Sequence, residues 1–142
     1  MVSKVFFDTN ILIYACDQDE PEKRDVSRRL ILQHSSNNTL TCISTQVIQK
    51  FYVAATKKLG IEPLMAKNII YSFQQMETCM VDISDINRAI DGSILWQVSF
   101  WDALIVAAAQ KLRCDIIYTE DLNHGQHFDS VRVTNPFLID KP

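Results

Sequence analysis

Short apolar runs alternate with longer stretches in which apolar residues recur every three or four positions, from one end of the chain to the other. The short runs predict strands at residues 2–7, 40–43, 79–81, 115–119 and 131–133. Strands joined by helix-length connections pair in parallel, and helices then cover both faces of the sheet. We therefore expect an α/β fold, a three-layer sandwich around a central, mainly parallel sheet of four to five strands.

The stretches between these strands predict helices, and residues with capping side chains or turn preferences mark their ends. Asp8-Thr9-Asn10, Ser44-Thr45, Ser84 and Ser99 are candidate N-caps, and Gly60 closes a helix. Residues 35–38 are expected to form a loop. The predicted helices cover residues 11–16, 22–33, 45–59, 63–76, 84–94 and 99–112.

Length and composition narrow the class of protein. The 142 residues fit a single domain, residues 1–142, with 47% hydrophobic and 22% charged residues. A net charge of −3 argues against a protein that coats nucleic acid, although it does not exclude an enzyme that cuts it. No leader-like segment or membrane-length apolar stretch is present, so we expect a cytoplasmic protein without a membrane partner. The four cysteines are too scattered for a disulfide framework or a zinc site, and Cys42, Cys79 and Cys114, in or beside predicted strands, are expected to be buried and reduced.

Three aspartates, Asp8, Asp102 and Asp121, each follow an apolar run. A carboxylate in that position costs several kcal/mol to desolvate unless it is paired or binds a metal. Asp8 and Asp121 fall at the carboxyl ends of predicted parallel strands, where ligands bind in open α/β sheets. A shared acidic pocket would suit a hard divalent cation and phosphodiester cleavage.

Four segments, taken together and in this order, resemble the PIN domain family, and within it the VapC-type toxin ribonucleases of bacterial toxin–antitoxin pairs. The resemblance covers nearly the whole chain and implies a Mg²⁺- or Mn²⁺-dependent endoribonuclease. It also implies an RNA substrate, a homodimer and a small antitoxin partner. The segments are Phe7-Asp8-Thr9-Asn10-Ile11-Leu12, Ile43-Ser44-Thr45-Gln46-Val47-Ile48-Gln49-Lys50-Phe51-Tyr52, Phe100-Trp101-Asp102-Ala103-Leu104-Ile105 and Tyr118-Thr119-Glu120-Asp121-Leu122-Asn123-His124-Gly125-Gln126.

Carried over by position, the resemblance implies that Asp8, Asp102 and Asp121 are the catalytic, metal-binding carboxylates. Asn10 and Thr119 correspond to polar residues that orient them. The metal would lower the pKa of a bound water and neutralise charge on the phosphate.

Lys50 departs from the family pattern, which usually has glutamate at this position in the helix after the second strand. An ammonium group about 4 Å from a divalent ion would be repelled by at most roughly 8 kcal/mol at an effective dielectric of 20. Lys50 could instead swing to solvent, or pair with Asp8 or Asp102 in the metal's place. Each outcome lowers metal affinity, so we expect a weakened nuclease. The alternative is a catalytically inactive PIN-domain protein that still binds antitoxin or RNA.

Two other phosphate-handling folds fit less well. A dehalogenase-like phosphatase needs a second aspartate two residues after the first, and this chain has Asn10 there. A response-regulator receiver needs an acidic pair and a lysine ending a late strand, whereas Asp8 stands alone and Lys50 falls in a predicted helix.

For the remaining polar and aromatic candidates we favour structural roles. Glu120 is expected to be solvated, and His124 to lie exposed in a loop, while His34 and His127 carry no signal. Basic clusters at residues 23–29 and at residues 57–58 are expected to be solvated helix faces. Five aromatic residues could stack RNA bases, but their spacing favours core or dimer packing: Tyr14, Phe51, Tyr52, Trp96 and Trp101.

Overall fold

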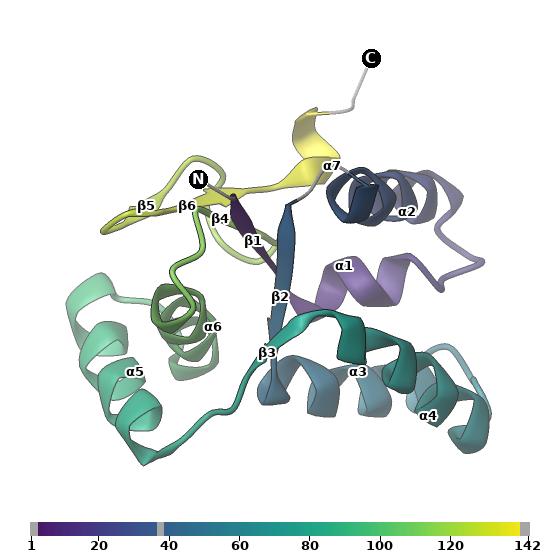
Figure 1. Ribbon diagram of the computed structural model, residues 1–142, viewed down its shortest axis with the longest axis horizontal. Coiled ribbons are helices and arrows are strands. Elements are labelled where there is room, and N and C mark those ends of the chain that lie inside the picture. The colour runs from purple at the N-terminus through teal and green to yellow at the C-terminus, as the bar shows by residue number, and fades with distance from the viewer. Residues whose placement is uncertain (1–2, 37–38, 140–142) are drawn as a thin grey trace.

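The computed structural model describes residues 3–36 and 39–139 and has a central sheet with helices on both sides (Figure 1). The predicted three-layer α/β fold is confirmed. In the described part of the chain the sheet has six strands in the order β3-β2-β1-β4-β6-β5. The strands are β1 Lys4–Phe7, β2 Leu40–Ser44, β3 Glu77–Cys79, β4 Ile116–Tyr118, β5 His127–Phe128 and β6 Val131–Thr134.

All neighbouring strands are parallel except β5, which pairs antiparallel with β6. β5 is two residues long and was not predicted. β3 lies two residues earlier than predicted, at Glu77–Cys79. Residue 2 of the first predicted strand and residues 37–38 of the predicted loop lie outside the described residues.

Helices α1 Thr9–Tyr14, α2 Pro21–Ser36, α3 Thr45–Lys57 and α4 Pro63–Ser72 lie on one side of the sheet, at the right of Figure 1. The 3₁₀ helix η1 Phe73–Gln75 follows α4, so the helix predicted for residues 63–76 is divided. α2 continues through Ser36, and the hydroxyls of Ser35 and Ser36 both donate to the Leu32 carbonyl.

Helices α5 Ile83–Trp96 and α6 Phe100–Lys111 cover the opposite side, and the short α7 Pro136–Ile139 ends the described chain near α2 (Figure 1). Residues 103–109 of α6 are all buried, because this helix lies between the sheet and α5. The small side chains Ala107, Ala108 and Ala109 permit this close approach. In residues 3–36 and 39–139, no single helix has the length and apolar composition of a membrane span, and α5 with α6 meets that test only as a pair bent by 117°.

The core is apolar on both faces of β1, where Val5, Phe6 and Phe7 are buried in succession. Such a continuous run is typical of a central strand in a parallel sheet with two covered faces. Cys42, Cys79 and Cys114 are buried and reduced, as predicted.

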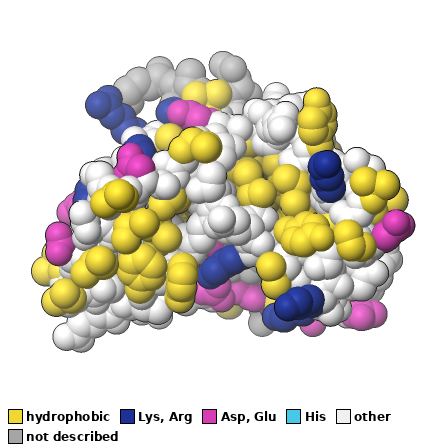
Figure 2. All heavy atoms as spheres, turned by 90° about the horizontal axis from the view of Figure 1, so that it is seen from below, with side chains coloured by type: hydrophobic (Ala, Val, Ile, Leu, Met, Phe, Trp, Pro, Cys, Tyr) yellow, Lys and Arg dark blue, Asp and Glu magenta, His cyan; other side chains and the backbone are white. Residues whose placement is uncertain are grey.

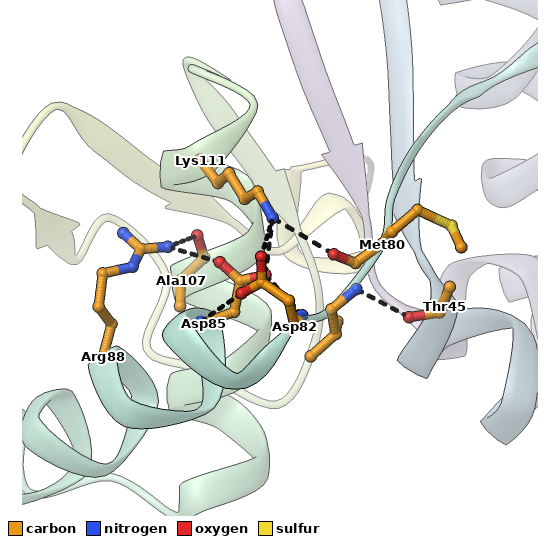
Figure 3. Close-up of polar contacts among 8 residues, drawn as sticks. Thr45, Met80, Asp82, Asp85, Arg88, Ala107 and Lys111 are labelled. Carbon is orange, nitrogen blue, oxygen red and sulfur yellow. Dashed lines mark hydrogen bonds and ion pairs between the residues drawn. The ribbon is translucent and has the colours of Figure 1, made fainter.

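A polar cluster fixes the start of α5 against α6 (Figure 3). Asp82 Oδ1 accepts the Asp85 amide at 2.9 Å, and Asp85 Oδ2 accepts the Asp82 amide at 3.0 Å. This capping box makes Asp82 the N-cap, so the prediction of Ser84 is wrong. Lys111 Nζ lies 2.8 Å from Asp85 Oδ2, and Arg88 donates to the Ala107 carbonyl at 2.8 Å. The two helices are therefore joined by buried charge as well as by packing.

Candidate active site

The candidate site lies at the carboxyl ends of two neighbouring strands, β1 and β4. Phe7 and Tyr118 are paired in register, and Asp8 and Thr119 are the next residues on each strand. The Asp8 amide extends this pairing by donating to the Tyr118 carbonyl at 3.0 Å. Two segments far apart in the sequence are thereby brought to the same edge of the sheet.

Thr119 is the centre of the hydrogen-bond network at this edge. Its hydroxyl donates to Asp8 Oδ2 at 2.8 Å and accepts the Asp121 amide at 3.1 Å. Asn10 Nδ2 donates to the same hydroxyl oxygen at 3.1 Å and to Asp121 Oδ2 at 3.2 Å. The Thr9 amide donates to Asp8 Oδ1 at 2.7 Å. Four of the residues singled out in the sequence, Asp8, Asn10, Thr119 and Asp121, are thus directly linked.

Asp8 is only 5% exposed, and this burial raises the pKa of its carboxyl to about 6. The hydrogen bonds from Thr119 and Thr9 oppose that rise, and the nearby Asp121 carboxylate adds to it. Asp121 is more exposed, yet loss of hydration still raises its pKa, while the bond from Asn10 opposes the rise. The two carboxyl groups have raised pKa values mainly because of burial and to a smaller extent because of neighbouring carboxylates, and a cation bound beside them would stabilise their ionised forms.

Asp102 approaches the same site from the first turn of α6. Ser99 caps this helix by accepting the Asp102 amide at 3.0 Å, and the Asp102 carboxylate contributes to the raised pKa of Asp121. The three predicted aspartates therefore influence one another through Asp121. Across residues 3–36 and 39–139, however, no three His, Cys, Asp or Glu side chains are grouped closely enough to bind a metal ion as they stand.

A cleft of about 890 Å³ opens beside Asp8 and Asp121, and its two walls carry opposite charge. The acidic wall comes from β1, the α1–α2 connection and the segment after β4. The basic wall comes from α3 and its C-terminal end, with Lys50, Lys57 and Lys58. The cleft can therefore accommodate both a cation and an anionic chain.

Lys50 faces this site without forming an ion pair in it. Its Nζ lies 5.7 Å from the centroid of the Trp101 ring, and no described carboxylate oxygen lies within 4.0 Å of it. The expected alternative, an ion pair with Asp8 or Asp102, is thus not found among the described residues. The positive charge is still close enough to lower the pKa of both Asp8 and Asp121.

Glu120 corrects one prediction, because its carboxylate is held by two partners rather than solvated. Tyr14 donates to Glu120 Oε1 at 2.6 Å, and Lys23 Nζ lies 3.0 Å from Oε2. The Lys23 ammonium also lies 4.7 Å from the centroid of the Tyr14 ring. This contact holds the segment carrying Asp121 against α1 and α2. Sequence reasoning missed it because nothing in the local pattern pairs residues this far apart.

The candidate aromatic and histidine residues divide between core and surface. Phe51 is fully buried and Trp96 packs edge-to-face on Phe128, as the structural interpretation predicted. Trp101 is 57% exposed, so of the two structural roles expected for it, core or dimer packing, the core role is wrong and the dimer role stays a prediction. His124 is exposed as predicted. His34 Nε2 lies 2.9 Å from the Tyr118 hydroxyl, a contact that the sequence did not indicate.

Comparison with known sequences identifies the family. The sequence model of the PIN domain matches residues 5–129. The chain belongs to the PIN domain family. That match includes Asp8, Asp102 and Asp121, and confirms the resemblance seen in the motifs. No curated protein matches the chain.

Solved structures with the same fold include VapC toxins. VapC20 of Mycobacterium tuberculosis, described as a Sarcin-Ricin loop cleaving toxin, superposes with a TM-score of 0.68 at 18% identity, covering 90% of this chain and 98% of that one. A toxin–antitoxin complex from Klebsiella pneumoniae gives a TM-score of 0.68 at 19% identity over 93% and 97%. VapBC2 of Rickettsia felis, bound to promoter DNA, gives 0.69 at 13% identity over 93% and 98%. At these identities the likeness establishes a VapC-like fold.

Proposed function

We propose that this PIN-domain protein is a divalent-metal-dependent endoribonuclease of the toxin–antitoxin kind, weakened by Lys50. The observation that carries the proposal is the buried Asp8 carboxyl, with a pKa raised to about 6, linked through Thr119 and Asn10 to Asp121. Keeping an ionisable group there costs stability, which is characteristic of a functional site. The VapC-like fold and the toxin identity of VapC20 support the choice of RNA as substrate.

The donor atoms fit Mg²⁺ or Mn²⁺, since both cations prefer oxygen ligands. Asp8 and Asp121 would bind the cation, with Asp102 contributing from α6. Asn10 lines the same cleft, and its buried Oδ1 has no hydrogen-bond partner among the described residues. The bound cation would supply an acidified water and charge neutralisation at the phosphate. Thr119 and Asn10 hold the carboxylates that receive it.

Lys50 favours a second candidate function, a catalytically inactive PIN-domain protein that retains antitoxin or RNA binding. The ammonium group lowers the pKa of Asp8 and of Asp121, so it partly neutralises their charge before any cation arrives. It would also repel a divalent ion. Both effects weaken metal binding.

The exposed apolar surface and the structural neighbours support two proposed protein partners. Figure 2 shows hydrophobic side chains gathered over the α5 side of the molecule, a pattern typical of an interface. We assign this α5 face to a homodimer contact, and we propose a small antitoxin as a further partner by analogy with the toxin–antitoxin complex from Klebsiella pneumoniae. We propose that the homodimer and its complex with the antitoxin form in the cytoplasm. The α5 face comprises Ile83, Ile86, Ile90, Ile94 and Leu95.

RNA cleavage by three matched proteins tests the function. With Mg²⁺ or Mn²⁺, the unmodified chain should cleave RNA slowly, Lys50→Glu should cleave faster, and Asp8→Asn should not cleave above an EDTA control. Cleavage by Asp8→Asn at the same rate would show a contaminating nuclease. Equal rates for Lys50→Glu and the unmodified chain would refute the weakening by Lys50. If neither the unmodified chain nor Lys50→Glu cleaves RNA, the second candidate function, an inactive protein that binds antitoxin or RNA, is favoured.

A further inference from the structure

The side chain of Trp101 is the feature next to the acidic site that packing does not explain. The residue is 57% exposed, and the next residue along α6 is Asp102. A buried tryptophan would remove some 150–250 Å² from water, so leaving it exposed forfeits a large stabilisation. Exposed aromatic rings beside a site that handles nucleic acid are the usual platforms for base stacking.

The backbone and one edge of Trp101 are held in place. Gln46 Nε2, on α3, donates to the Trp101 carbonyl at 3.3 Å, and the ring meets Phe100 edge-to-face at 5.1 Å between centroids. Gln46 is itself only 5% exposed. A ring that is fixed before its ligand arrives loses little conformational entropy on binding. The Trp101 side chain is therefore preorganised for stacking, although it is not part of the hydrophobic core.

Lys50 places a cation near both this ring and the acidic site. Its Nζ lies 5.7 Å from the ring centroid, and its charge acts on Asp8 and Asp121. A cation–π contact at an exposed position is weak, so the ammonium remains available to a phosphate. Lys57 and Lys58 extend the positive charge along the cleft, the first of them two helical turns, or about 10 Å, from Lys50.

We propose that Trp101 and Lys50 form a binding site for one unpaired nucleotide, with the base stacked on the indole and the adjoining phosphate on the ammonium. This inference rests on the proposed ribonuclease function and narrows its substrate to single-stranded RNA. A base inside a duplex has both faces covered by its neighbours, whereas an unpaired base offers a free face. Lys50 then contributes substrate affinity at the position where it weakens metal binding.

Binding of RNA without cleavage tests the proposal. A labelled oligouridine and a matched blunt RNA duplex are titrated in EDTA, and the affinity is followed by fluorescence anisotropy. The single strand should bind more tightly than the duplex. Trp101→Ala should weaken single-strand binding about 5- to 150-fold, and Trp101→Phe should weaken it less. Lys50→Met should also weaken the salt dependence of binding, lowering the slope of log affinity against log salt concentration by about one.

Tyr71→Ala is the matched control, because Tyr71 is an exposed aromatic residue at the end of α4, whereas Trp101, on α6, lies beside Lys50. It should bind as the unmodified chain does. Unchanged affinity in Trp101→Ala, or equal affinity for duplex and single strand, would overturn the proposal. So would a loss of affinity that coincides with a changed sedimentation coefficient, because Trp101 would then be a dimer contact.

The same proteins separate this proposal from the proposed function. If RNA binding depends on Trp101 but no variant cleaves RNA, Lys50→Glu included, the proposed nuclease function is refuted and the nucleotide-binding site is supported. If Trp101→Ala cleaves RNA and also binds it with unchanged affinity, the nucleotide-binding site is refuted and the ribonuclease function is not.

Discussion

The Thr119 hydroxyl donates to the Asp8 carboxylate at 2.8 Å, although 111 residues separate the two in sequence. The contact exists because β1 and β4 are neighbouring parallel strands that end at the same level. It fixes the orientation of a buried carboxylate beside Asp121. Removing this one hydroxyl should therefore disturb the electrostatics of the whole site.

Thr119→Val should shift the pH dependence of the proposed RNA cleavage to higher pH. The lost hydrogen bond normally lowers the pKa of Asp8, so that pKa should rise above its value of about 6. The unpaired groups left behind should also cost about 1–3 kcal/mol of stability. Thr119→Ser keeps the hydroxyl and should behave as the unmodified chain. A pH–rate profile of Thr119→Val that matches that of Thr119→Ser would contradict this role.

Asp8→Asn should stabilise the metal-free fold at neutral pH. The pKa of Asp8 rises from 3.8 to about 6 on folding, so the folded state binds its proton more tightly than the unfolded chain. The stability of the unmodified chain should fall as the pH rises from about 4 to about 6, by at most about 3 kcal/mol. The amide of the variant does not titrate, so the variant should escape this loss. Urea unfolding in EDTA would measure the difference, which should be large at pH 7 and small at pH 4. A pH-independent difference would contradict the burial of a titrating carboxyl group.

Lys50→Glu should strengthen metal binding. Replacing the ammonium by a carboxylate removes a repulsion and adds an oxygen ligand beside Asp8 and Asp121. Mn²⁺ at a hundred times its dissociation constant should stabilise the variant by about 2.7 kcal/mol, seen as a raised melting temperature. The unmodified chain should need more Mn²⁺ for the same shift.

Lys58→Glu makes the same charge change two helical turns farther along the cleft wall and is the control for that measurement. Its response to Mn²⁺ should stay close to that of the unmodified chain. If both variants respond alike, the gain reflects overall charge rather than the position of residue 50.

Asp82→Ala should destabilise the protein by about 0.5–2 kcal/mol, because Asp82 accepts the Asp85 amide at the start of α5. Asp82→Ser keeps an acceptor and should cost less. Ser84→Ala should have little effect, although the sequence alone would choose Ser84 as the cap. Urea denaturation of the three variants measures the free energy of unfolding of each. A larger loss for Ser84→Ala than for Asp82→Ala would contradict the observed capping box.

The sequence predicted the layers and the position of Asp8 because a parallel sheet follows from regular, local patterns. Buried runs mark the strands, and a residue that follows such a run must lie at the sheet edge. β5 was missed because a two-residue antiparallel strand has no periodicity to detect. The choice between Asp82 and Ser84 failed because both residues are good caps, and only the reciprocal bond with Asp85 decides between them.

The surroundings of the site could not be predicted because they depend on side chains meeting across the fold. Glu120 looked solvated until α1 and α2 placed Tyr14 and Lys23 against it. Trp101 looked like a core residue because its neighbours in α6 are apolar, yet its own direction exposes it. The direction of Lys50 likewise depends on rotamers that no spacing rule determines.

The order of the strands also has a consequence for protein synthesis. Asp8 is made well before its partner Thr119 and the neighbouring Asp121, because 111 residues separate Asp8 from Thr119 in the sequence. Since β1 and β4 must pair before these groups meet, a growing polypeptide carries no complete acidic site until β4 and the residues after it have been made. A translation product that stops before β4 therefore lacks the site altogether.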